Sequence, residues 1–290
     1  MRKAFLFVLA VSFFFDLVAQ VTPVASPEQW IEEGRAAMEE EDYFKAVDIY
    51  TRIIEAAQAS KGDEITPESK YFEARYYRAV CYFYLDEWEY AISDLDLFIT
   101  GIPTFPQAYI LKSIIYQKQL RFNDQLASLN NALSFLQEEE WPRIYRLRAA
   151  AYLGLEKLDS ALIDLKRGLS VEENAEGVAL LGYIYYKKGD YDSAMFNYNK
   201  AIGLDFTFVA TYQYAASYCL EQNQNDKAMT YITLGLLAEP ETPELIFLKG
   251  VVFQEWGRTD EACSLFNRAF YAGIDDAGDY LSEYCYPIER

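Results

Sequence analysis

The segment 179–204 most constrains what this chain can fold into, because it reads as a helix, a tight turn and a second helix. Gly182 lies in the first half, and Gly189 marks the turn. In the second half, Ala194 and Tyr198 are one helical turn apart. Small residues thus stand where two helices would cross, with aromatic residues beside them. The segment predicts a helical hairpin.

The same hairpin pattern recurs along the chain, and one position in its second helix serves as a marker. The markers are Ala46, Ala91, Gln125, Ala161, Ala194, Ala228 and Ala262. Their spacings are 45, 34, 36, 33, 34 and 34 residues. Because one hairpin cannot bury its apolar face alone, neighbouring hairpins must stack. We expect an all-α solenoid of about seven repeats. Whether Gln125, the one polar residue among the markers, breaks the stack of hairpins is left open.

The spacing and these residues resemble the tetratricopeptide repeat family, whose period is about 34 residues. The matching residues of the first and fifth hairpins are Trp30, Gly34, Tyr43 and Ala46, then Gly182, Tyr185, Gly189, Tyr191 and Ala194. The resemblance covers about residues 28–274 and implies a right-handed superhelix of helix-turn-helix repeats. It implies little about function, since one fold hosts many functions.

The first residues read as a secretory signal peptide. Arg2 and Lys3 precede the apolar run 4–15, and the small residue Ala19 ends the segment. We expect cleavage after this alanine, a periplasmic or secreted location typical of an exported bacterial protein, and no membrane span afterwards. The alternative is an uncleaved anchor, although the run is short for a span of roughly 20 residues.

The remaining chain divides into a linker, a solenoid and a cap. We expect the linker at 20–27, the solenoid at 28–274 with a surface insertion at 57–70, and a capping helix and tail at 275–290. The cap is expected to be one helix from Asp275 to Cys285. Its two sides are predicted to carry Tyr280, Leu281 and Tyr284 inward, and Asp279, Ser282 and Glu283 outward.

Charge and cysteine content restrict the partners and the compartment. The net charge of −19 repels phosphate backbones and anionic lipid, which argues against nucleic acid and is consistent with a soluble exported protein. The four cysteines are Cys81, Cys219, Cys263 and Cys285. They could form disulfides in an oxidising compartment, or the first three could be buried small apolar residues on helix faces.

The chain contains no histidine, which removes Ser-His and Cys-His nucleophiles and most transition-metal sites. The fingerprints of nucleotide-binding loops and of serine hydrolases are also missing from the sequence. A carboxylate pair could still act as acid and base, but most of the 45 acidic residues are expected on solvated helix faces. We therefore expect no enzyme, cofactor or metal site.

Binding is the remaining function, and the family resemblance implies a concave groove lined by the first helix of each hairpin. The groove residues carried over are Tyr76, Val80, Phe83, Ile110, Ile114, Gln117, Arg143, Arg146, Leu153, Tyr183, Tyr186, Lys187, Gln213, Ser217, Phe247 and Val251. Tyrosine and arginine are frequent interface anchors, so we expect this groove to bind a segment or helix of a bacterial envelope protein. The alternatives are tyrosines that pack neighbouring repeats, or tyrosines that stack on sugar rings of glycan or peptidoglycan.

Arg143 and Arg146 share one helix face, whereas Arg148 does not. They could receive a partner carboxylate, such as a chain terminus. The alternative is pairing with local acids, for instance those at 138–140, since surface ion pairs are common.

Overall fold

The computed structural model describes residues 27–59 and 73–286, and within these ranges it contains fifteen α-helices and no β-strand. The all-α prediction is confirmed. The expected signal peptide, the linker up to residue 26 and most of the insertion at 57–70 lie outside the described residues, so these assignments stay predictions.

The chain forms two compact units, one up to Ile115 and one from Tyr116 onward. The first holds α1 (Pro27–Glu39), α2 (Tyr43–Ala59), α3 (Ala74–Tyr84), α4 (Trp88–Gly101) and most of α5 (Pro106–Lys118). The second holds α6 (Phe122–Leu133), α7 (Trp141–Gly154), α8 (Leu158–Val171), α9 (Ala175–Lys187), α10 (Tyr191–Leu204), α11 (Ala210–Glu221), α12 (Asn225–Ala238), α13 (Pro243–Glu255), α14 (Thr259–Tyr271) and α15 (Asp276–Tyr280).

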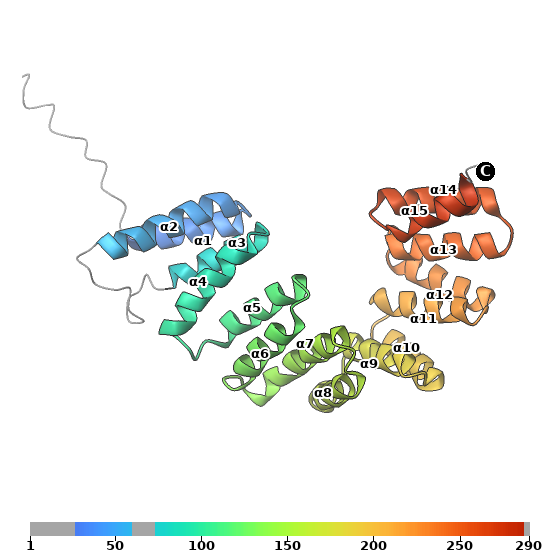
Figure 1. Cartoon of the computed structure of the whole chain (residues 1–290), viewed down its shortest axis with the longest axis horizontal. Helices are drawn as coiled ribbons and strands as arrows, with labels where there is room; N and C mark the ends of the chain where they lie inside the picture. Colours follow the sequence, from blue (N-terminus) through green and yellow to red (C-terminus); the bar gives the residue numbers. More distant parts are fainter. Residues whose placement is uncertain (1–26, 60–72, 287–290) are drawn as a thin grey trace, which may run out of the picture. The chain divides into compact units, whose positions relative to one another are not determined.

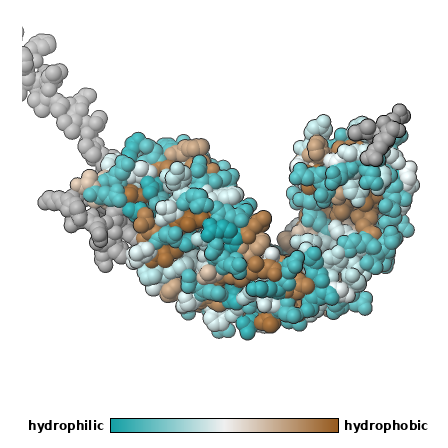
Figure 2. Space-filling view, viewed as in Figure 1, coloured by the Kyte–Doolittle hydropathy of each residue, from teal (hydrophilic) through white to brown (hydrophobic). Residues whose placement is uncertain are grey.

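Successive helices pack in pairs within each unit. In the first unit the pairs are α1 with α2 and α3 with α4, and in the second they are α7 with α8, α9 with α10, α11 with α12, and α13 with α14 (Figure 1). In the second unit α11 also lies against the first helices of the neighbouring pairs, α9 and α13. Helices α9, α11 and α13 thus form a continuous layer, and the side of the second unit that carries its first helices is called the A-helix face below. Hydrophilic residues cover most of the visible surface of both units, and hydrophobic residues form scattered patches among them (Figure 2).

A small residue faces a large one inside each hairpin, at positions 16 residues apart. A Cβ added to Gly34, Gly182 or Gly250 would lie only 2.6–2.8 Å from the ring of Tyr50, Tyr198 or Phe266, respectively. The same two positions in the other hairpins hold an alanine or serine with an aliphatic residue. These pairs are Ala79 and Leu95, Ser113 and Leu129, Ala149 and Leu165, and Ala216 and Ile232, all at most 1% exposed. The pairs keep the volume at each crossing similar, as close packing requires.

Each hairpin turns at one residue with a positive φ angle. These residues are Glu41, Asp86, Leu120, Glu156, Gly189, Asn223 and Gly257. They recur at the spacings of the marker positions, because every first helix ends in the same turn. In the fifth hairpin, the Asp190 amide donates to the Tyr185 carbonyl at 3.0 Å, and the Gly189 amide to the Tyr186 carbonyl at 2.9 Å. This is the hydrogen-bond pattern of a Schellman motif.

Helix α6 runs through Gln125 without a break, and this side chain is fully buried. Neither polar atom of its amide has a hydrogen-bond partner among the described residues. The boundary between the two units falls in the same hairpin, inside α5. The polar marker thus replaces an alanine without interrupting its own helix.

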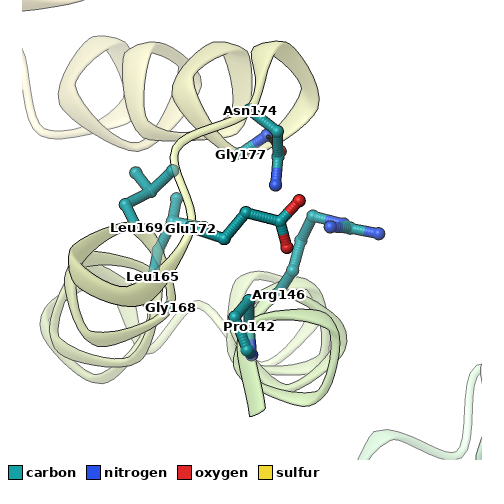
Figure 3. Close-up of a pocket in the computed structure, with 8 residues that line it drawn as sticks. All are labelled: Pro142, Arg146, Leu165, Gly168, Leu169, Glu172, Asn174 and Gly177. Atoms are coloured by element: carbon teal, nitrogen blue, oxygen red, sulfur yellow. Dashed lines mark hydrogen bonds between the residues drawn. The ribbon is translucent and has the colours of Figure 1, made fainter. Parts of the chain in front are cut away.

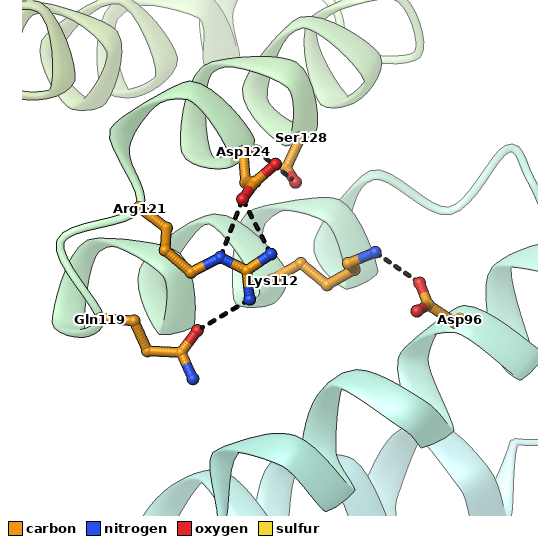
Figure 4. A network of polar contacts seen from close by, with 6 residues as sticks. All are labelled: Asp96, Lys112, Gln119, Arg121, Asp124 and Ser128. Carbon is orange, nitrogen blue, oxygen red and sulfur yellow. Dashed lines mark hydrogen bonds and ion pairs between the residues drawn. The ribbon is translucent and has the colours of Figure 1, made fainter.

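Charged contacts of the α5–α6 hairpin lie within each of the two units (Figure 4). In the first unit, the Lys112 ammonium pairs with the Asp96 carboxylate. In the second, the Arg121 guanidinium bonds the Asp124 carboxylate at 2.8 Å, and the Ser128 hydroxyl donates to the Asp124 carbonyl at 3.0 Å. Contacts of this kind at exposed positions add little stability.

The C-terminal cap differs from the single helix expected. Helix α15 is short and continues as a π-helix, Leu281–Cys285, whose last residue forms a disulfide with Cys263 of α14. The interpretation of Cys263 as a buried apolar residue is therefore wrong, whereas Cys81 and Cys219 are buried thiols as that alternative proposed. Burial raises the pKa of the Cys81 thiol to about 12.

The side chains of the cap divide much as expected. Leu281 is buried, and the ring of Tyr280 packs against those of Phe247 and Phe266, with centroids 5.2 and 5.0 Å away. The polar side chains of the cap, Asp279, Ser282 and Glu283, are exposed. Tyr284, expected on the inner side, lies in the π-helix and is 38% exposed.

Candidate functional site

An open cleft of about 520 Å³ lies on the A-helix face of the second unit, between the turn that joins α7 to α8 and helix α9. It is lined by Leu153, Gly154, Glu156, Leu158, Tyr183 and Lys187. Its volume is in the range of ligand-binding clefts in proteins. It brings together three of the expected groove residues, Leu153, Tyr183 and Lys187.

Helix α9 presents one wall of this cleft. Its N-terminus is capped by the Asn174 side chain, which accepts a hydrogen bond from the Gly177 amide at 2.8 Å. Tyr183 and Lys187 are four residues apart and share a face. The ammonium of Lys187 lies 5.7 Å from the centroid of the Tyr183 ring, within the range of a cation–π contact. The cleft thus has a cationic edge over an aromatic floor.

The opposite wall depends on Gly154 at the end of α7. A Cβ at this position would lie 2.4–2.6 Å from the ring of Phe122, so a larger residue would push α7 and α6 apart. Beyond it, Glu156 is exposed and Leu158 is half-buried at the start of α8. This wall offers one carboxylate and apolar side chains to a ligand.

A cluster of tyrosines continues the A-helix face from α9 to α11. The Tyr183 ring lies 5.3 Å from that of Tyr214 and 6.2 Å from that of Tyr186. The Tyr186 hydroxyl donates to the carboxylate of Glu221 at 2.5 Å. This hydrogen bond, helped by burial, raises the pKa of Tyr186 to about 12. The tyrosines therefore pack adjacent repeats together and also line the open surface.

Of the two arginines expected to receive a partner carboxylate, Arg146 is paired inside the protein. Arg146 pairs with Glu176 at 3.0 Å, and Figure 3 shows the Glu172 carboxylate directed toward the same arginine, beside a pocket of only about 10 Å³. A local acid thus engages Arg146, as the alternative interpretation proposed, although it is Glu176 and not one of the acids at 138–140. Arg143 is exposed and has no polar partner in the described part of the chain.

The third arginine of α7 belongs to the interior. Arg148 lies 3.0 Å from the carboxylate of Asp164, which is 3% exposed, but the two groups are not aligned for a hydrogen bond. In the first unit, by contrast, the Arg78 guanidinium donates two hydrogen bonds to the Asp94 carboxylate, at 2.6 and 2.8 Å. Both pairs span 16 residues. Burial raises the pKa of Asp164, and the two nearby arginines, Arg148 and Arg167, oppose this shift. These ion pairs connect the two helices of a hairpin and are not available to a ligand.

The other expected groove residues lie outside the cleft. Ile110 is 8% exposed, Tyr76 packs 5.1 Å from the ring of Phe105, and Phe247 packs under the cap. Phe83 and Ile114 are half-buried in the first unit, and the Gln213 amide donates to Glu244 at 3.4 Å in the second. As partner-binding residues they stay predictions.

Three residues that line the cleft were not expected, namely Gly154, Glu156 and Leu158, and neither was Glu221, which accepts the hydrogen bond from Tyr186. The family geometry identifies the first helix of each hairpin, whereas Glu156 and Leu158 belong to the turn and the start of the second helix. The repeat register would have located this turn, since its positive-φ residue recurs with the markers. Glu221 ends α11, and only packing of adjacent repeats places it beside Tyr186.

The described residues contain no cluster of three potential metal ligands. Among the same residues, every helix is too short or too polar to cross a bilayer.

The sequence profile of the tetratricopeptide repeat family matches residues 175–208, which form α9 and α10 and the residues just after them. The chain is a tetratricopeptide repeat protein. The profile covers one hairpin, and the other helix pairs share its fold, so the prediction of an all-α tetratricopeptide repeat solenoid is confirmed. Comparison of the sequence with curated proteins finds no match.

Several solved structures share this fold. A tetratricopeptide repeat protein from Parabacteroides merdae superimposes with a TM-score of 0.75 at 16% identity, covering 89% of this chain and 98% of that one. The Cut9–Hcn1 hetero-tetramer of the APC/C gives 0.60 at 13%, covering 90% and 56%. MamA from Desulfovibrio magneticus gives 0.53 at 18%, covering 62% and 94%. At these identities the similarity concerns the fold alone.

Proposed function

We propose that this tetratricopeptide repeat protein is an exported, non-enzymatic adaptor that binds a segment of a partner protein in the cleft beside Tyr183 and Lys187. The observation that carries the proposal is the open cleft of about 520 Å³ on the A-helix face. Tetratricopeptide repeats generally serve as scaffolds that bind other proteins, and solenoids use extended surfaces for this purpose. The partner would be a component of a bacterial envelope complex.

The walls of the cleft define the chemistry of the segment. Leu153 and Leu158 provide an apolar surface for one side chain of the partner. The exposed ammonium of Lys187 would attract a carboxylate, either an acidic side chain or a chain terminus. Glu156, on the opposite edge, can accept a hydrogen bond from a backbone amide. An extended segment with an apolar residue next to an acidic one fits this arrangement.

Two observations support the proposed location outside the cytoplasm. The disulfide between Cys263 and Cys285 is typical of oxidising compartments. The apolar run at 4–15 follows two basic residues, as in a signal peptide. Mass spectrometry of the purified mature chain should find Gln20 at its N-terminus, and a chain that retains residues 1–19 would contradict the proposal.

Sugar binding by the groove tyrosines is less favoured. The centroid of the Tyr183 ring lies 6.2 Å from that of Tyr186 and 5.3 Å from that of Tyr214. Rings that pack on each other leave less open area for stacking on a sugar. We therefore assign the cleft to a protein segment.

A pair of matched charge reversals tests the assignment. Lys187→Glu removes the cation from the cleft, where the ammonium lies 5.7 Å from the centroid of the Tyr183 ring. Lys166→Glu is the matched control, because Lys166 is an exposed residue of α8 whose ammonium lies 5.6 Å from the centroid of the Tyr185 ring. A photoreactive phenylalanine analogue at Glu156 would capture the partner in whole cells, and mass spectrometry would identify it. We expect capture to fall at least tenfold with Lys187→Glu and to persist with Lys166→Glu.

The opposite results would reject the proposal. Equal capture in both variants would mean that the cleft cation plays no part in binding. Capture of the same partner by the analogue placed at Phe196, an exposed residue of α10, would move the binding surface away from the A-helix face.

A further inference from the structure

A second cleft, of about 410 Å³, lies between two adjacent turns of the second unit, outside the site proposed above. One side is the turn between α11 and α12, and the other is the end of α13. The cleft is lined by Asn223, Gln224, Asn225, Asp226, Lys227 and Trp256. Its lining therefore combines one large aromatic residue with three amides, one carboxylate and one ammonium group.

Trp256 is a positioned aromatic platform. It is 40% exposed, although most tryptophans are largely buried. The Phe253 ring packs beside it, with centroids 6.0 Å apart, and the Arg258 guanidinium lies 4.0 Å from the centroid of the Phe253 ring. Arg258 in turn bonds the Glu261 carboxylate at 2.6 Å. This chain of contacts holds the indole in place while leaving part of it open to solvent.

The polar side chains of the cleft are available to a ligand. Within the described residues, none of the five makes a hydrogen bond through its side chain to another protein group. Asn223 occupies the left-handed turn with a φ of 55°, and Asn225 is the first residue of α12. The backbone therefore fixes the position of the Cβ atom from which each amide side chain extends. Amides offer donors and acceptors together. The one acid and the one base cancel in charge, so the cleft favours a neutral, hydroxyl-rich ligand.

We propose that this cleft binds a neutral carbohydrate, with one sugar ring stacked on Trp256 and its hydroxyls bonded to the amides of the turn. A sugar ring has an apolar face and a rim of hydroxyls, which matches an aromatic platform beside free amides. A nucleotide would also stack on the indole, but its phosphates are repelled by a chain of net charge −19. A purely apolar ligand would leave the amides without partners.

Calorimetric titration of the mature chain with four neutral hexasaccharides tests the proposal. The probes are maltohexaose, cellohexaose, mannohexaose and chitohexaose, each used up to its limit of solubility. We expect at least one to bind. Trp256→Ala should weaken that binding at least tenfold, and Asn225→Ala should weaken it several-fold without removing the platform.

Two controls separate this site from the rest of the molecule. Tyr271→Ala removes a tyrosine that is 86% exposed at the other end of α14, and Lys187→Glu alters the cleft of the proposed adaptor site. Neither should change the sugar affinity. The proposal is overturned if no hexasaccharide binds, if affinity is the same in Trp256→Ala and Asn225→Ala as in wild type, or if Lys187→Glu abolishes it. The last result would place the sugar in the groove instead.

Discussion

Gly182 lies so close to the phenol ring of Tyr198 that a Cβ on the glycine would sit 2.7 Å from the ring. In the preceding hairpin the equivalent positions hold Ala149 and Leu165, both buried. The backbone spacing of a repeat therefore accepts a glycine with an aromatic residue or an alanine with an aliphatic one. Residue size at one position depends on residue size at the other.

Exchanging both members of this pair should reveal the dependence. Gly182→Ala alone should lower the free energy of unfolding by roughly 2 kcal/mol, because a rigid ring must move. Adding Tyr198→Leu should restore part of that loss, since the double variant copies the preceding repeat. Urea denaturation of wild type, both single variants and the double variant gives the coupling energy. Strictly additive effects would contradict the proposed size complementarity.

The hydrogen bond from Tyr186 to Glu221 predicts a dependence of stability on pH. Because the pKa of Tyr186 is raised to about 12 in the folded chain, its contribution is fully present below about pH 10, the ordinary tyrosine pKa. It should be lost as the pH rises from 10 to 12. We expect wild type to lose more stability in this window than Tyr186→Phe, measured by thermal unfolding. Parallel curves for the two proteins would show that the hydrogen bond contributes nothing.

Leu120 occupies a left-handed turn with a φ of 56° and is 72% exposed. This backbone conformation is costly for a side chain with a Cβ, and little burial would be lost by removing it. Leu120→Gly should therefore stabilise the chain by about 0.5–1 kcal/mol. The matched control is Asn223→Gly at a φ of 55°, because asparagine tolerates this region better. A larger gain at 223 than at 120, by denaturant titration, would contradict the argument.

The disulfide between Cys263 and Cys285 holds the cap against α14. The double variant Cys263→Ser/Cys285→Ser should destabilise the C-terminal end by roughly 3 kcal/mol, the chain-entropy value for a loop of this length. Hydrogen exchange should accelerate over residues 276–285 and change little in α7–α10. Wild type treated with a reducing agent should behave like the variant. Identical exchange in all three samples would show that the cap docks without the bond.

Local order was predictable from the sequence because each hairpin repeats one pattern of small, aromatic and turn residues. Within one segment of chain, a helix crossing is marked by Ala194, the aromatic residue packed at it by Tyr198, and the turn by Gly189. The period of about 34 residues then predicts how many such hairpins follow one another. The helix pairs and the polar outer side of the cap followed from the same local rules.

The binding surface was only partly predictable. Family geometry selected Tyr183 and Lys187, which line a cleft, and it also selected Ile110 and Phe247, which are largely taken up by packing. Which side chains remain accessible to a ligand depends on how closely neighbouring repeats pack against each other. The repeat pattern does not predict this packing for individual side chains.

By itself, the sequence determined the number and the register of the helical hairpins, because hydrophobic period and turn chemistry act over a few residues. Only the tertiary structure decided that Cys263 pairs with Cys285, that Arg146 is engaged by Glu176, and that Trp256 stands open above the neighbouring turn. Each of these depends on residues from different helices meeting in space. Packing between helices, rather than local preference, decides which groups meet and which remain available to a partner.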